Sequence, residues 1–290
     1  MHPAAAGPRS DLGIEADTFD RVARRVRRHV VKIAGTPHGC HLGGALSCVE
    51  ILVTLYFDVL RLDPRDPQWP QRDMFVFSKG HAAAALYSVL VERGYLPEVS
   101  LATYCAAGSP LLGHPTRHIP GVEFATGSMG HGLSIGVGVA LALRRAGNRE
   151  SRVFVLLGDG ELQEGAVWEA VMAAHHFGLD NLCAVVDRNL GQNDGATESV
   201  MRLGEVAPRW QAFGWDARTV DGHDFAALRT ALAAVPYAAG RPSVVVARTI
   251  KGRGVAGIEG DVRSHYMTLS TRGVERALRG LRSTGPAGSP

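Results

Sequence analysis

The sequence has few cysteines, and their scarcity excludes two classes of protein. Its 290 residues include four cysteines, none of which belongs to a closely spaced pair. They are Cys40, Cys48, Cys105 and Cys183. A small disulfide scaffold and a zinc site built on Cys-x-x-Cys pairs are therefore excluded. Scattered cysteines are typical of a reducing compartment, so we expect a cytoplasmic protein.

Long apolar runs and a strong net charge are also missing. No stretch approaches the roughly 20 apolar residues of a membrane span, and no basic start followed by an apolar core opens the chain as in a signal peptide. The formal net charge is only +3. The one dense arginine cluster, residues 21–28, is interleaved with apolar residues at helical spacing, which predicts an amphipathic helix with a solvated basic face. We expect neither a nucleic-acid nor a membrane partner.

Apolar segments of strand and helix length alternate along the chain, of which 46% is hydrophobic. Candidate strands lie at 74–77, 153–157, 182–186, 216–220 and 243–248. Candidate helices lie at about 45–60, 82–92, 130–145, 163–177 and 225–234. This alternation predicts one α/β domain over residues 15–282, a doubly wound parallel sheet with helices on both faces. Residues 1–14 and 283–290 are rich in small residues and proline, and we expect them to be disordered tails.

Residues 152–195 are predicted to form a unit of strand, turn, helix and strand, and the functional prediction begins from this unit. Its first apolar run leads directly into Gly158-Asp159-Gly160, and its second is followed by Asn189. With a right-handed crossover both strands end at the same sheet edge, where open α/β sheets bind ligands. Asp159 and Asn189 should therefore lie together.

These two residues carry oxygen atoms that suit a metal. One carboxylate, one amide oxygen and a carbonyl of the loop after Asn189 supply three hard ligands, and Mg²⁺ takes its other ligands from water and phosphate. Gly158 and Gly160 let the backbone approach a phosphate, and a helix N-terminus follows. Taken alone, Gly-Asp-Gly is more often a simple turn. Its position between two strands favours a site for a metal and a diphosphate.

The same residues carry a family resemblance. Gly158-Asp159-Gly160 followed by Asn189 resembles the thiamine diphosphate fingerprint, and residues 158–165 are similar to its transketolase form. The resemblance covers about residues 20–266. It implies that Asp159, Asn189 and the Gly191 carbonyl bind Mg²⁺, or another divalent cation such as Ca²⁺, which in turn binds thiamine diphosphate. It also implies that Gly158, Gly160 and Glu161 belong to the cofactor-binding segment.

Histidine is abundant, with twelve residues, and four of them match the active-site histidines of transketolases. The resemblance implies that His81 binds the diphosphate, that His265 bridges diphosphate and substrate, and that His41 and His114 contact the reacting ketose. It also makes Lys251 a possible phosphate partner. Neutral imidazole both donates and accepts hydrogen bonds, which suits sugar hydroxyls and carbonyls. We therefore predict His41, His114 and His265 as catalytic residues.

A second segment joins the predicted site by resemblance. Thr126-Gly127-Ser128-Met129-Gly130 is similar to the loop beside the cofactor rings, where Gly127 would give a hydrogen bond and Met129 an apolar wall. Taken alone, the segment is more typical of a turn that begins a helix.

The sequence departs from the transketolase pattern at several positions, most of them on the substrate side. Cys40 and Leu42 flank His41 where the family usually has Gly and Pro, His131 stands where Gln is common, Gly191 replaces a branched apolar residue, and Ser264 and Tyr266 flank His265 unusually. These departures concern the identity of the substrate.

A further element of the family is missing. In transketolases a glutamate of a second α/β domain activates the cofactor, and only about twenty-five residues follow His265, too few for such a domain. The resemblance thus implies the N-terminal subunit of a split transketolase. It would transfer a two-carbon ketol unit from a ketose or ketose phosphate to an aldose. The C-terminal subunit would carry the pyrimidine-binding domain and the activating glutamate, in an α2β2 heterotetramer.

The sequence leaves two alternative functions open. One is decarboxylative acyl transfer from a 2-oxo acid, as in deoxyxylulose phosphate synthases or E1 α subunits. The other is a non-catalytic phosphosugar- or nucleotide-binding module.

Overall fold

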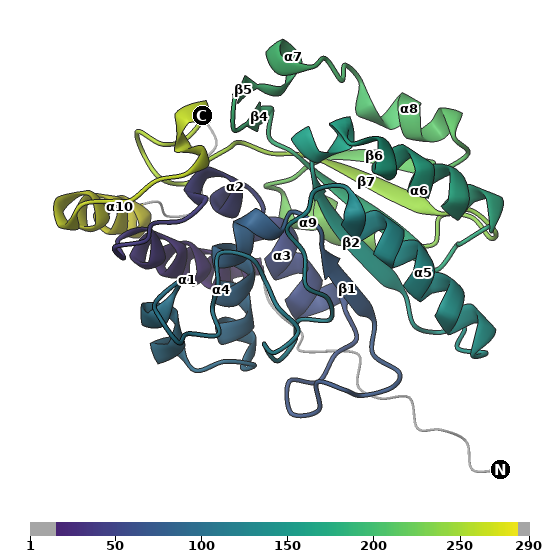
Figure 1. Ribbon diagram of the computed structural model, residues 1–290, viewed down its shortest axis with the longest axis horizontal. Coiled ribbons are helices and arrows are strands. Elements are labelled where there is room, and N and C mark those ends of the chain that lie inside the picture. The colour runs from purple at the N-terminus through teal and green to yellow at the C-terminus, as the bar shows by residue number, and fades with distance from the viewer. Residues whose placement is uncertain (1–15, 284–290) are drawn as a thin grey trace.

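The computed structural model describes residues 16–283 and contains a five-stranded parallel sheet (Figure 1). The strand order is β1-β2-β3-β7-β6, and every neighbouring pair is parallel. The strands are β1 (Met74–Phe77), β2 (Val153–Gly158), β3 (Leu182–Arg188), β6 (Asp216–Asp221) and β7 (Ser243–Arg248). The predicted doubly wound fold is confirmed. Both predicted tails lie outside the described residues, except Ser283, which ends the last helix.

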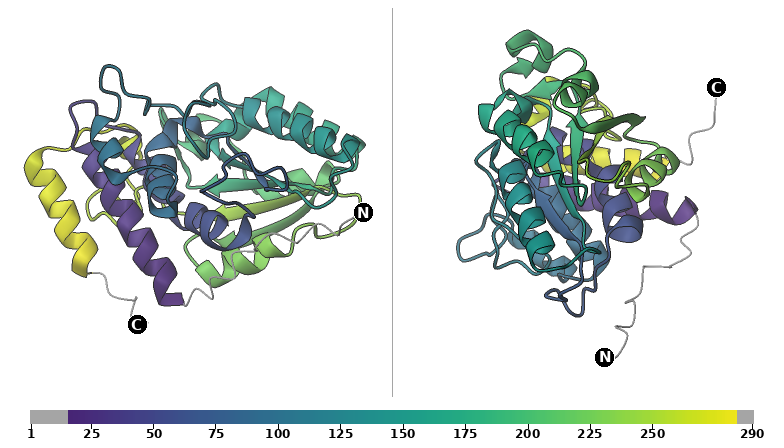
Figure 2. Two further views of the ribbon diagram at one scale, coloured as in Figure 1. Left: turned by 90° about the horizontal axis from the view of Figure 1, so that it is seen from below. Right: turned by 90° about the vertical axis from the view of Figure 1, so that its right-hand side faces the viewer.

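Helices cover both faces of the sheet, as two views in Figure 2 show. Alternate side chains of one strand point to opposite faces. In β2, Phe154 and Leu156 therefore join one core, while Val153, Val155 and Leu157 join the other. The first core includes residues of α1 (Ala16–Ala34), α3 (Val49–Thr54), α4 (Ala83–Arg93) and α9 (Phe225–Ala233). The second includes residues of α5 (His131–Arg145), α6 (Gly165–His176) and α8 (Val206–Ala212).

The single helix predicted for about 45–60 is wrong. The chain instead forms α2 (Leu42–Ser47), α3 and a π-helical turn at Leu55–Val59, with Cys48 between α2 and α3 in a non-helical conformation. The Ser47 hydroxyl at this break donates to the buried Asp187 at 2.6 Å. A tertiary hydrogen bond to a charged group thus accompanies the break in an otherwise helical apolar segment.

Several elements were not predicted, all but one of them short. They are a hairpin of β4 (Gly191–Gln192) and β5 (Gly195–Ala196), the helices α7 (Thr197–Val200), α8 and α10 (Thr271–Ser283), and four 3-10 segments, Gly80–Ala82, Glu98–Thr103, Gly160–Gln163 and Val262–His265. Most of these follow strands or connect loops, so they depend on tertiary contacts more than on periodicity. Among residues 16–283, no helix has the length and apolar character needed to cross a bilayer.

The close packing of α5 on the sheet depends on Gly136. A Cβ at this position would lie 2.5 Å from Val155 Cγ2, whereas a Cβ at Gly138 of the same helix meets no atom within 4 Å. We predict that Gly136→Ala lowers the free energy of unfolding by about 1–3 kcal/mol, because it forces the helix from the strand. The matched Gly138→Ala should stabilise by roughly 0.5–1 kcal/mol, since alanine has the higher helix propensity. Urea unfolding followed by circular dichroism measures both; equal effects of the two variants would contradict this account.

Candidate active site

The ends of β2 and β3 bring Asp159 and Asn189 together, as their positions in the sequence predict. The strands are parallel neighbours, so both following loops leave the same edge of the sheet. The Leu190 backbone N–H donates to Asp159 Oδ2 at 2.8 Å, and the Gly191 N–H donates to Asn189 Oδ1 at 3.1 Å. Backbone N–H groups of the loop after β3 therefore hold both the Asp159 carboxylate and the Asn189 amide.

Two cationic side chains contact oxygen atoms at this edge, those of the Gly191 carbonyl and the Asp159 carboxylate. The Lys251 ammonium donates to the Gly191 carbonyl at 2.8 Å, and Arg188 donates to Asp159 Oδ2 at 3.1 Å. Burial, followed by the nearby charge of Asp187, raises the pKa of Asp159 even though Arg188 acts in the opposite direction. An added cation would offset this cost of burying the carboxylate. The Asp159 carboxylate and the Gly191 carbonyl therefore already face positively charged side chains.

A divalent cation fits this set of donors. Within the described part of the chain, no three His, Cys, Asp or Glu side chains group in a way that could hold a metal. The available donors are instead a carboxylate, an amide oxygen and a backbone carbonyl, from Asp159, Asn189 and Gly191. Mg²⁺ and Ca²⁺ prefer such oxygens, and Mg²⁺ commonly completes its shell with phosphate. Their role as ligands stays a prediction.

The absence of a side chain at Gly191 makes room for Lys251. A Cβ at 191 would lie 2.8 Å from Lys251 Cδ, so a larger residue would displace this side chain. Burial, followed by the charge of Lys79, lowers the pKa of Lys251 to about 8. Its Nζ also lies 3.0 Å from His265 Nδ1. Lys251 thus links the loop of oxygen donors to a histidine predicted to bind diphosphate and substrate.

A buried ion pair that sequence reasoning missed lies beneath this loop. Lys79, just after β1, donates to Asp187 at the end of β3, and both side chains are fully buried. Burial alone would raise the pKa of Asp187, but the Lys79 charge and hydrogen bonds from Ser47 and Thr249 outweigh it and lower that pKa. Asn189 Nδ2 also donates to Asp187 at 3.1 Å. The signal in the sequence was a charged residue at the end of each of two apolar strands.

Glu161 is buried behind the Gly158-Asp159-Gly160 turn. It accepts a hydrogen bond from the Ser78 hydroxyl, one from the Gly130 N–H at 2.9 Å and one from the Gly158 N–H at 3.1 Å. Burial raises its pKa despite these donors. Glu161 therefore connects three loops at the sheet edge, while its binding of cofactor stays a prediction.

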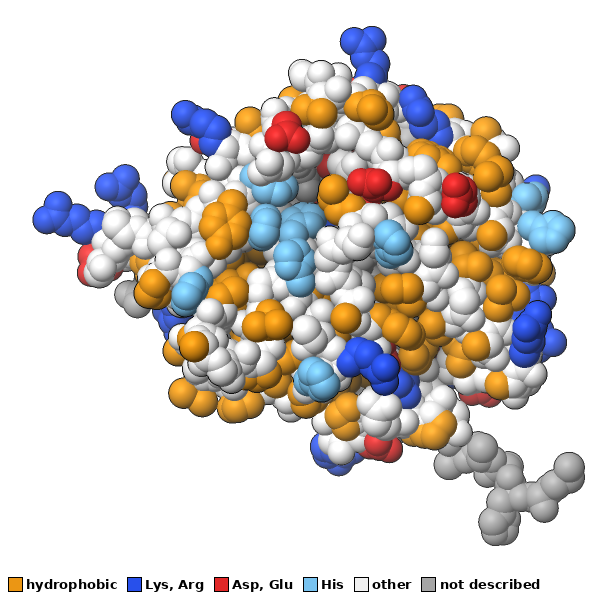
Figure 3. Space-filling model, viewed as in Figure 1, with side chains coloured by type: hydrophobic (Ala, Val, Ile, Leu, Met, Phe, Trp, Pro, Cys, Tyr) orange, Lys and Arg blue, Asp and Glu red, His pale blue; other side chains and the backbone are white. Residues whose placement is uncertain are grey.

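The four predicted histidines, which come from separate loops, lie in one cluster. The His41 ring is central, with its centroid 5.3 Å from that of His81, 6.2 Å from His114 and 5.4 Å from His265. His81 and His265 are stacked at 5.5 Å. Figure 3 shows histidine side chains gathered in one patch on the face of the molecule that it displays. The structure therefore brings together residues that are up to 224 positions apart.

Three of these imidazoles are neutral near pH 7. Burial, followed by His114, lowers the pKa of His41 to about 4, and burial, followed by Lys251, lowers the pKa of His265 to about 3. Burial also lowers the pKa of His81 well below its ordinary value. A neutral imidazole has one donor and one acceptor nitrogen. The buried His41 Nδ1 has no hydrogen-bond partner among the described residues.

The loop of residues 126–130 borders the histidine cluster. Thr126 Oγ1 donates to the Phe77 carbonyl at 2.7 Å, which ties the loop to the end of β1. Gly127 has a φ of 151°, and a Cβ there would lie 2.8 Å from His114 Cδ2. Glycine therefore permits the close approach of the loop to His114. The Met129 side chain is 46% exposed at this edge.

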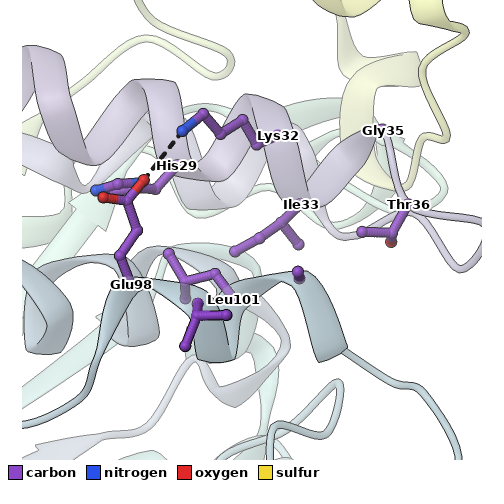
Figure 4. A pocket seen from close by; sticks show the side chains of 9 residues that line it. His29, Lys32, Ile33, Gly35, Thr36, Glu98 and Leu101 are labelled. Carbon is purple, nitrogen blue, oxygen red and sulfur yellow. Dashed lines mark hydrogen bonds and ion pairs between the residues drawn. The ribbon is translucent and has the colours of Figure 1, made fainter.

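A surface pocket of about 460 Å³ lies elsewhere, between α1 and the 3-10 segment Glu98–Thr103 (Figure 4). A hydrogen bond of 3.0 Å from Lys32 Nζ to Glu98 crosses one side of it. None of the predicted site residues lines this pocket. This pocket therefore lies apart from the predicted site.

Comparisons with known proteins agree with the resemblance found in the sequence. The family described as "Transketolase, thiamine diphosphate binding domain" matches residues 19–283. One subunit of the apulose-4-phosphate transketolase of Actinobacillus succinogenes is 41% identical over 92% of this chain and 96% of its own length. The subunit of the same name from Phocaeicola vulgatus is 38% identical over 92% of this chain and 94% of its own length.

A solved structure is similar as well. The Pichia stipitis transketolase in complex with sedoheptulose-7-phosphate superposes with a TM-score of 0.81 and 31% sequence identity, over 91% of this chain. The chain spans only 40% of the length of that enzyme. The family match over residues 19–283 and these relatives lead to one conclusion. The chain belongs to the transketolase family, of which it contains the thiamine diphosphate-binding domain.

Proposed function

We propose that this chain, together with a complementary subunit, transfers a two-carbon ketol unit from a ketose or ketose phosphate to an aldose. The observation that carries the proposal is the cluster of His41, His81, His114 and His265 beside the oxygen donors at the sheet edge. A binding module would need the oxygen donors alone. The added set of imidazoles, which includes the neutral rings of His41, His81 and His265, suits hydrogen bonding to the hydroxyls and carbonyls of a sugar.

The proposed cofactor site has two parts, a set of oxygen ligands for the metal and two nitrogen-containing side chains for the diphosphate. Asp159, Asn189 and the Gly191 carbonyl would hold Mg²⁺, and His81 with Lys251 would contact the diphosphate. Thiamine diphosphate supplies, when bound, the carbon nucleophile that allows the bond beside a ketose carbonyl to break. A pKa of about 8 leaves Lys251 predominantly charged at neutral pH, as a phosphate partner requires.

The substrate side belongs to His41, His114 and His265. Their rings are close enough to contact neighbouring oxygens of one sugar. His41 is a neutral imidazole, with one donor and one acceptor nitrogen, so it can orient the carbonyl or hydroxyl of the donor. The neutral rings of His41 and His265 can each accept a hydrogen bond, which a protonated imidazole could not.

The names of two relatives support the proposal of a complementary subunit. Two of them are each named as one subunit of a transketolase, and they are matched over 94% and 96% of their length. We infer that the partner carries the pyrimidine-binding domain and the activating glutamate, and that two copies of each chain form an α2β2 assembly. Met129 and Met172 are 46% and 50% exposed, on the loop before α5 and on α6, and support a covered surface there. The free cysteines are compatible with a cytoplasmic assembly.

The metal site generates a binding prediction. Asp159→Ala and Asn189→Ala should each weaken thiamine diphosphate binding in the presence of Mg²⁺, because the cation would lose a protein ligand. Loss of outer-shell partners alone costs about 10- to 100-fold in metal affinity, so the loss of a ligand should cost at least as much. Isothermal titration calorimetry of the assembled complex measures the affinity. Asn193→Ala, at an exposed residue of the β4–β5 hairpin turn, is the control; unchanged affinity in both test variants would refute the site.

The histidine cluster generates a pH prediction. The folded-state pKa values of His41 and His265 are about 4 and 3, below the ordinary 6.5. Below pH 6.5 and above these lowered pKa values, the unfolded chain therefore binds more protons than the folded chain. Folding stability that is present above pH 6.5 is lost as the pH falls toward 4. Urea midpoints at pH 7 and pH 5 should differ, and His41→Asn should reduce the difference. His118→Asn, at an exposed histidine, should leave it unchanged. A His41→Asn profile equal to that of the parent chain would disprove this origin.

The inferred partner generates an activity prediction. The purified chain with thiamine diphosphate and Mg²⁺ should not transfer ketol units, because the proposal places the activating glutamate on the second chain. The complex isolated from the native cell should be active, and the isolated chain should regain activity when the second chain is added. A coupled assay of aldose release from a ketose phosphate measures both states. Robust turnover by the lone chain would overturn the two-subunit proposal.

A further inference from the structure

Tyr266 lies directly beside the central histidine of the cluster. Its ring centroid is 4.9 Å from that of His41, and the two planes meet at 89°. This is nearer than any of the three histidines that surround the same ring. Tyr266 therefore forms one side of the space around His41.

The backbone and the hydroxyl of Tyr266 fix the position of its ring. The hydroxyl donates to the His38 carbonyl. The next residue, Met267, pairs with Cys40 through two backbone hydrogen bonds of 3.0 Å. The tyrosine is thus held at both ends against the segment that carries His41. A ring fixed in this way loses little conformational entropy when a ligand packs on it.

The ring is also open to solvent, because 53% of Tyr266 is exposed. An exposed aromatic surface beside hydrogen-bonding histidines offers apolar contact to the C–H groups of a sugar, while the histidines contact its oxygens. The fixed ring also limits the space next to His41. Both effects act on the part of a donor that extends beyond the reacting carbonyl.

We propose that Tyr266 determines which ketose donors the enzyme accepts, by packing its ring against the donor carbon chain and restricting the length of that chain. The inference rests on the proposed function, in which His41 contacts the reacting ketose. Tyr266 takes no part in bond breaking. It acts through contact and exclusion, so its effect should appear in the relative use of donors.

The test uses the two-subunit complex and two donors of different length, xylulose 5-phosphate and sedoheptulose 7-phosphate. Tyr266→Ala should raise the kcat/KM of the longer donor relative to the shorter by about 10-fold, within the range that apolar pocket contacts give. The KM of the shorter donor should rise more than its kcat falls. Tyr266→Phe keeps the ring and should preserve the donor ratio of the parent enzyme.

Thiamine diphosphate affinity, measured by calorimetry, should be equal in all three proteins. The Tyr266 ring adjoins His41 and its hydroxyl donates to the His38 carbonyl, and neither residue is predicted to bind the cofactor. An unchanged donor ratio in Tyr266→Ala would overturn the proposal. A uniform fall in kcat for both donors would do the same, since it would show that Tyr266 only supports His41.

Failure of the proposed function would have a different result. A parent complex that binds thiamine diphosphate but transfers no ketol unit from either donor would refute that function, and the inference on Tyr266 with it. An active parent complex with no change of ratio in the variant refutes the inference on Tyr266 alone.

Discussion

The buried ion pair between Lys79 and Asp187 is the interaction on which the site depends. It joins the end of β1 to the end of β3, and Thr249 after β7 donates to the same carboxylate. Both charges are fully buried, which is costly unless hydrogen bonds satisfy their remaining donor and acceptor atoms. Here the Gly44 carbonyl accepts a further bond from Lys79 at 2.9 Å. The pair thus links the ends of β1 and β3 and the segment after β7 to α2. The predicted site residues His81, Asn189 and Lys251 follow those three strands.

Much of this arrangement could be predicted from the sequence, because parallel strands impose it. Continuous apolar runs located β2 and β3, and the right-handed crossover rule placed Asp159 and Asn189 at one edge, where the structure has them. The break in the helix predicted at 45–60 accompanies a hydrogen bond from Ser47 to Asp187 across 140 positions, which no local pattern in the sequence indicates. The ion pair was missed for the same reason. Its partners become neighbours only once strand order is known, and periodicity within a segment contains no such information.

The histidine cluster was predicted by resemblance and not by spacing. Nothing local indicates that the loops of His41, His81, His114 and His265 meet, whereas the structure places these rings within 6.2 Å of the central one. The family match and the relatives confirm the resemblance at the level of the fold and the cofactor-binding domain. Tyr266 could be noted as unusual in the sequence, but only the structure shows that its ring adjoins His41.

The position of Glu161 has a consequence for how such a protein can change over evolutionary time. This one buried carboxylate bonds to Gly130, at the start of helix α5, and to Gly158, which precedes Asp159. A substitution that moves the Gly130 backbone would shift an acceptor that is shared with the strand end before Asp159. The start of α5 and the turn after β2 therefore cannot change independently of each other. Side chains around Gly130 can be exchanged over evolutionary time only where its backbone N–H stays in place.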